Sequence, residues 1–181
     1  ERPDVAKSPV STLRFVFEVF VMKVLGTIAL LILYPLAPNL ASTWGFSPGQ
    51  ISLLNTVSEF AALPAGFLAP LGDTGKYGNF GLLIVSWIVS CISVLAMLAP
   101  PEIAAVLCAR LVYNFFYTIW QVSIQSVVIS QVEGDKRGWA TGFIELGWAI
   151  GVLLLAVFVL IFDLLDWHAI FAILGGLMSF Y

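Results

Sequence analysis

The sequence predicts an all-α integral membrane protein with six transmembrane helices. Hydrophobic residues make up 60% of the 181-residue chain and charged residues only 10%, whereas soluble domains carry about a quarter charged residues. The apolar residues form continuous runs that are long enough to cross a bilayer core of about 30 Å as helices. These runs lack the alternating pattern of a membrane β-barrel, so the predicted element is the helix.

Proline, glycine and charged residues divide the apolar sequence into spans. A short cytoplasmic segment, residues 1–12, precedes a helical bundle over residues 13–181. The predicted spans are Leu13–Leu36, Gln50–Leu71, Phe80–Ala99, Ile103–Val132, Trp139–Phe162 and Trp167–Tyr181. The predicted breaks are Pro38 with the cluster 47–49, the loop 70–79, the prolines 100–101, the turn 133–135 and the segment 163–166.

The first and last spans have unusual features. The first is too long for a cleaved signal peptide and is interrupted by Glu18 and Lys23, so we expect it to be retained. The last, Trp167–Tyr181, would be only about 22 Å long as a straight helix. It is therefore either a truncated helix of a longer chain or a short re-entrant helix.

Basic residues predict that the amino terminus lies in the cytoplasm. Six basic residues fall on the amino-terminal side of the membrane, namely Arg2, Lys7, Arg14, Lys76, Lys136 and Arg137. The loops on the opposite side, residues 39–49, 100–102 and 163–168, contain no Lys or Arg. This asymmetry follows the positive-inside rule.

Ionisable residues within the spans should be paired or face water, because each costs a few kcal/mol in the bilayer. At about 1.5 Å per residue, Glu59 and Arg110 lie roughly 10–14 Å from the outer face, and Lys23 and Glu145 lie roughly 10–15 Å from the inner face. Depth therefore predicts the pairs Glu59–Arg110 and Lys23–Glu145. One acid could then couple protons, or Arg110 could bind an anionic substrate; the alternative is that both pairs only lock helices together.

The fourth span carries a polar stripe on an otherwise apolar helix. Its members recur at helical spacing and are Arg110, Asn114, Tyr117, Gln121 and Gln125. Lipid would not tolerate this face, so we expect it to line a substrate cavity rather than to bond to a neighbouring helix. Tyr34 and Asn55 are expected to contribute to the cavity from the first two spans.

Helix packing and shape are also encoded in the sequence. Gly147 and Gly151 in the fifth span have the spacing that lets helix backbones approach closely. Pro64 in the second span should kink that helix. Motifs for phosphate binding, metal ligation, hydrolysis or nucleic-acid binding are absent from the sequence. We therefore expect no enzyme, no cofactor, no metal site and no nucleic-acid partner; the expected partners are a small-molecule substrate and the lipid bilayer.

The loop after the second span resembles the signature loop of the major facilitator superfamily. Asp73, Lys76 and Gly78 match the family's order of an aspartate, a basic residue and a glycine, although two extra residues stand between the first two. Arg110 resembles the arginine that opens the family's fourth-helix motif. Residues 135–142 resemble the family's loop between the fourth and fifth helices. Residues 166–171 resemble the start of its sixth helix.

The resemblance implies half of a twelve-helix transporter, built from two three-helix inverted repeats. A second six-helix half, in the same chain or another subunit, would complete an alternating-access transporter of a small solute, with proton coupling as an option. Asp73, with Lys76 and Gly78, would latch the inner-side helices, with Arg137 as a partner. The alternative is a transporter-like structural or cofactor-holding subunit of a larger membrane complex, in which Glu59 and Arg110 would be sealed.

Overall fold

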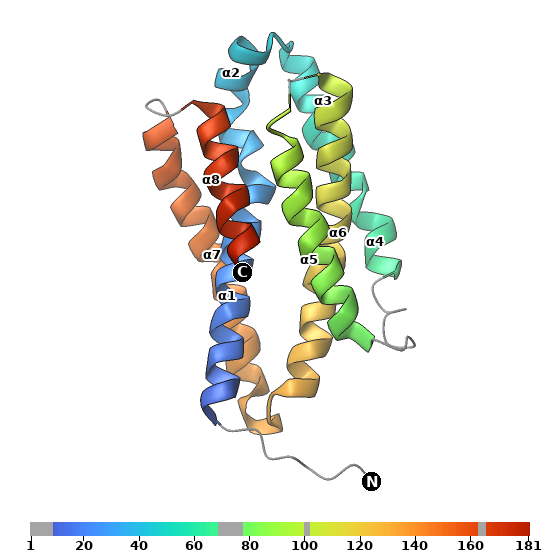
Figure 1. Cartoon of the computed structure of the whole chain (residues 1–181), viewed down its shortest axis with the longest axis vertical. Coiled ribbons are helices and arrows are strands. Elements are labelled where there is room, and N and C mark those ends of the chain that lie inside the picture. Colours follow the sequence, from blue (N-terminus) through green and yellow to red (C-terminus); the bar gives the residue numbers. More distant parts are fainter. Residues whose placement is uncertain (1–8, 69–77, 100–101, 163–165) are drawn as a thin grey trace.

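The computed structural model describes residues 9–68, 78–99, 102–162 and 166–181, and this part of the chain contains helices and no strands (Figure 1). Its α-helices are α1 (Pro9–Leu31), α2 (Leu33–Trp44), α3 (Pro48–Phe60), α4 (Ala62–Leu68), α5 (Gly78–Ala96), α6 (Ile103–Gln131), α7 (Arg137–Phe162) and α8 (Trp167–Phe180). A 3-10 turn, η2 (Gly134–Lys136), precedes α7. The predicted all-α class is therefore confirmed.

Four helical stretches of the described residues are long and apolar enough to cross a membrane. They are Thr12–Pro38, Pro48–Leu68, Ile103–Gln131 and Gly134–Phe158. The stretches Phe80–Ala96 and Trp167–Phe180 are apolar but shorter. Four of the six predicted spans thus have the required length within the described residues.

Two prolines divide the first two predicted spans into pairs of helices. A proline inside a helix has no N–H for the carbonyl four residues earlier, and its ring crowds that carbonyl. The helix α1 ends at Leu31, four residues before Pro35, and α3 ends at Phe60, four residues before Pro64. At Pro64 the helix is interrupted at the single residue Ala61, whose φ of −65° and ψ of −22° stay in the helical region. The first predicted span breaks in its interior rather than ending near Leu36.

The predicted helix end at Pro38 is wrong, because α2 runs through this proline to Trp44. The stop lies at Gly45, whose φ of 69° is in the left-handed region that favours glycine. Ser47 and Gln50 then form a capping box that starts α3. The turn between the first two spans is therefore shorter than the sequence pattern predicts.

The helices pack in two groups that meet through α5 with α8 and through α1 with α6. Figure 1 shows α1, α7 and α8 side by side and α3, α4 and α5 gathered around α6, with contacts from α5 to α8 and from α1 to α6. The glycines on α7 explain its close approach to α1. A Cβ atom on Gly151 would lie 2.8 Å from the Thr27 Cβ, and one on Gly147 would lie 3.0 Å from the Phe20 carbonyl oxygen.

Candidate functional site

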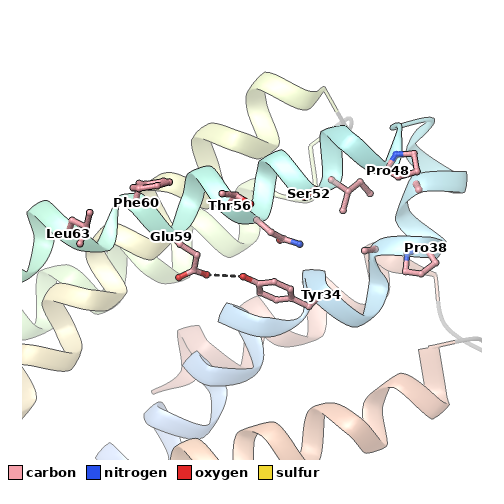
Figure 2. A pocket seen from close by; sticks show the side chains of 12 residues that line it. Tyr34, Pro38, Pro48, Ser52, Thr56, Glu59, Phe60 and Leu63 are labelled. Atoms are coloured by element: carbon pink, nitrogen blue, oxygen red, sulfur yellow. Dashed lines mark hydrogen bonds between the residues drawn. The ribbon is translucent and has the colours of Figure 1, made fainter.

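A groove of about 920 Å³ lies between α2 on one side and α3 with α4 on the other (Figure 2). Its lining residues are Tyr34, Ala37, Pro38, Ala41, Pro48, Ile51, Ser52, Asn55, Thr56, Glu59, Phe60 and Leu63. The volume falls in the range of small-molecule sites, which is about 300–1,000 Å³. The groove is large enough to hold a drug-sized solute.

Tyr34 and Glu59 connect the two walls of the groove. The Tyr34 hydroxyl donates a hydrogen bond of 3.1 Å to Glu59 Oε1 (Figure 2). Both side chains are exposed in the isolated chain, Tyr34 to 44%. Tyr34 is the second residue of α2, just after the break between α1 and α2. Glu59 is one residue before the end of α3. Glu59, the only acid among the described lining residues, thus lies beside a phenol from the opposite wall.

The polar residues of α3 form one row along the groove. Ser52, Asn55, Thr56 and Glu59 have the i, i+3, i+4, i+7 spacing of a single helix face. Asn55 is 9% exposed, and its Oδ1 has no hydrogen-bond partner among the described residues. Of this row the sequence analysis singled out Asn55 and Glu59 but missed the two hydroxyl residues. The helical spacing back from Glu59 was the signal that could have found them.

Arg110 is fully buried and does not line the groove. Its Nη1 donates to the Ala29 carbonyl at 3.0 Å and its Nη2 donates to the Leu30 carbonyl, both near the end of α1. The predicted Glu59–Arg110 ion pair is not formed. The last carbonyls of a helix lack partners within it and carry partial negative charge, so they compete with the acid for this guanidinium.

Tyr117 of the polar stripe on α6, together with the nearby Tyr113, also packs against α1 instead of lining the groove. Tyr113 donates to the Gly26 carbonyl at 2.7 Å, and the hydroxyls of Tyr117 and Thr27 are 3.4 Å apart. The ring of Tyr117 fits because residue 26 is a glycine, whose Cβ would lie 2.2 Å from a ring carbon. This part of the stripe bonds to the neighbouring helix, which is the alternative to the expected cavity.

The amides of the stripe differ in their exposure. Asn114 is buried at 2% exposure, and neither polar atom of its side chain has a hydrogen-bond partner among the described residues. Gln121 is half-buried and Gln125 is exposed. Neither Asn114 nor Gln121 lines the groove. The candidate site is therefore smaller than the sequence analysis expected, and its described residues come from the first two spans.

Lys23 on α1 and Glu145 on α7 form an ion pair. The Lys23 Nζ lies 3.4 Å from Glu145 Oε2. The lysine side chain is 5% exposed, whereas the glutamate side chain is 45% exposed. The ion pair therefore joins a buried ammonium on α1 to a half-exposed carboxylate on α7.

The sequence matches a family model described as the Major Facilitator Superfamily over residues 19–181. The chain belongs to the Major Facilitator Superfamily. The resemblance drawn from Asp73, Lys76, Gly78 and Arg110 is therefore confirmed. Members of this superfamily are transporters, so the protein is a transporter of the major facilitator type, with apolar helices that suit an integral membrane protein. No curated protein matches the chain.

The predicted latch of this superfamily member lies partly outside the described residues. Asp73 and Lys76 fall within residues 69–77, which the structure does not describe. Gly78 is the first residue of α5, and Arg137 is the first residue of α7. The two described members of the latch are thus both at helix starts.

Local bonds hold the turn between α6 and α7. The Arg137 Nε donates to the Val132 carbonyl at 3.0 Å. The Lys136 Nζ lies 2.5 Å from Glu133 Oε2. Arg137 is therefore partly engaged within its own turn.

Proposed function

We propose that this protein moves a small solute across the membrane by alternating access as a secondary active transporter. The observation that carries this proposal is the groove with Glu59 on its wall. Glu59 stands eleven residues after Pro48, the first residue of α3, so it lies roughly 17 Å along the helix from its outer end. An exposed acid near the middle of a bilayer core of about 30 Å marks a substrate or ion pathway.

The helix contacts support the inverted-repeat architecture that alternating access uses. The contacts of α1 with α7 correspond to those of α6 with α3 and α4, if the first three spans are superposed on the last three. The contact of α5 with α8 joins the third span of each set. Such repeats let one set of helices rock against another around a central site.

We also propose that the amino terminus is cytoplasmic and that a second six-helix half completes the transporter. The distribution of basic residues supports the orientation. Asp73, Lys76, Gly78 and Arg137 would then meet at the inner face as the latch. The alternative of a structural or cofactor-holding subunit would seal both Glu59 and Arg110. Arg110 is enclosed, as that alternative expects, whereas the exposure of Glu59 in the groove favours transport.

Alternating access is testable by labelling one residue of the groove from both sides of the membrane. Thr56 is exposed on the groove wall and is replaced by cysteine in a protein lacking Cys91 and Cys108. The matched control is Leu153→Cys, an exposed apolar position on α7. We expect a membrane-impermeant maleimide to label Thr56→Cys from either side, with the favoured side reversing when the solute gradient is reversed.

The control should react poorly from both sides, because a lipid-facing thiol is not reached by a hydrophilic reagent. Labelling of Thr56→Cys from one side only, whatever the gradient, would contradict alternating access at this groove.

A further inference from the structure

From the charge and shape of the groove we infer that it binds organic monocations, with Glu59 as their counter-charge. The inference rests on the proposed transport function and names its substrate class. The expected ligand is an amine or a delocalised cation with an apolar body. Its charged group would lie against the carboxylate, and its body would lie against the apolar walls of α2 and α3.

Charge is the first argument. Glu59 is the only ionisable acid or base among the twelve lining residues, apart from the phenol of Tyr34. Its Oε1 accepts the Tyr34 hydroxyl, and its Oε2 has no partner among the described side chains. Arg110 lies close enough for its charge to interact with Glu59 and Tyr34, but it is fully enclosed, bonded to carbonyls of α1 and absent from the groove lining. A ligand in the groove therefore meets a carboxylate and no exposed cation.

The apolar wall is the second argument. Seven of the twelve lining residues are apolar, and two of them, Phe60 and Leu63, are 63% and 62% exposed. Phe60 lies next to Glu59 in sequence, and Tyr34 lies across the groove from Glu59 (Figure 2). Aromatic rings attract organic cations through their negative faces. The combination of one carboxylate with aromatic and aliphatic walls suits a lipophilic cation.

The competing ligand classes fit less well. An anion would face the Glu59 carboxylate without a basic partner in the lining. A sugar would need polar groups around most of its surface, whereas the row of Ser52, Asn55, Thr56 and Glu59 lies on one wall only. The groove therefore selects by charge first and by apolar contact second.

The test compares two ions of the same shape and opposite charge. Tetraphenylphosphonium and tetraphenylborate are equilibrated by dialysis with the purified protein in detergent, with protein-free micelles as background. We expect saturable binding of the cation and none of the anion. Glu59→Gln should weaken cation binding by about tenfold or more, because removing a charge partner near a low-dielectric wall costs at least that factor.

Two further variants control for folding and for general charge. Phe60→Leu should weaken cation binding several-fold. Phe60 is 63% exposed, so this substitution leaves the packing of the helices intact. Glu18→Gln removes an acid on α1 that pairs with Arg14 and lies outside the groove, so it should leave binding unchanged. Equal binding of cation and anion, or unchanged cation binding in both groove variants, would overturn the inference.

The inference and the proposed function fail in different ways. If the reconstituted protein carries neutral or anionic solutes but does not bind tetraphenylphosphonium, transport stands and the cation site falls. If the cation binds through Glu59 but Thr56→Cys never changes its accessible side, the cation site stands and alternating access falls.

Discussion

Replacing Gly151 by alanine should separate α1 from α7 and destabilise the protein. An added Cβ would lie 2.8 Å from the Thr27 Cβ and 2.9 Å from the Val24 carbonyl oxygen. Ordinary contact begins at 3.4 Å, so the helices must move apart by at least about 0.6 Å, the difference between 3.4 and 2.8 Å. A backbone carbonyl cannot turn away as a side chain can, and overpacking of this kind costs about 1–3 kcal/mol.

The matched control is Gly142→Ala on the same helix, where an added Cβ would meet nothing within 4 Å. Both variants gain the same helix propensity, about 1 kcal/mol, so their difference isolates the packing term. Gly147→Ala should fall between them, since its Cβ would lie 3.0 Å from the Phe20 carbonyl oxygen.

Reversible unfolding in mixed micelles, followed by tryptophan fluorescence, measures the free energy of unfolding for the three variants. We expect Gly151→Ala to be about 1–3 kcal/mol less stable than Gly142→Ala. Equal stability of these two variants would refute the close packing of α7 on α1.

Three further predictions concern the charged residues. Arg110→Met should lower the free energy of unfolding by about 2–4 kcal/mol, because it leaves two α1 carbonyls and their cavity unfilled, whereas Arg14→Met at the exposed helix start should change it by less than about 0.5 kcal/mol. Lys23→Met and Glu145→Gln should show a coupling of about 1 kcal/mol in a double-mutant cycle, and a coupling near zero would show that the pair is not maintained in the membrane. Asp73→Asn should lower the maximal transport rate more than the apparent solute affinity in proteoliposomes, and the reverse result would count against a latch.

Helix existence could be predicted from the sequence because lipid requires every backbone group to be satisfied within a helix. The positions of the breaks depended on choosing between neighbouring prolines. Pro38 coincides with no helix end, whereas Pro35 and Pro64 both end a helix four residues earlier. The composition alone does not say which proline a helix will tolerate, because packing around each one decides.

Depth along a helix was enough to predict the ion pair of Lys23 and Glu145, because the glycines of α7 let it pack closely against α1. Depth was not enough to predict the partners of Arg110 and Glu59, which do not form an ion pair. Depth gives no direction around the helix axis, and the sequence does not reveal that the end of α1 offers carbonyls to a guanidinium. Two members of the stripe on α6, Arg110 and Tyr117, have polar partners on α1 instead of in a cavity, whereas Asn114 has none among the described residues.

The two proline breaks have a mechanical consequence for the first two spans. At each break one backbone hydrogen bond is already missing, so bending there disrupts no intact bond and is cheaper than bending elsewhere along the helix. Tyr34 follows the first break and Glu59 precedes the second, and their hydrogen bond links the two spans beside these breaks. A solute that draws the carboxylate away from the phenol would break this side-chain link between the two spans.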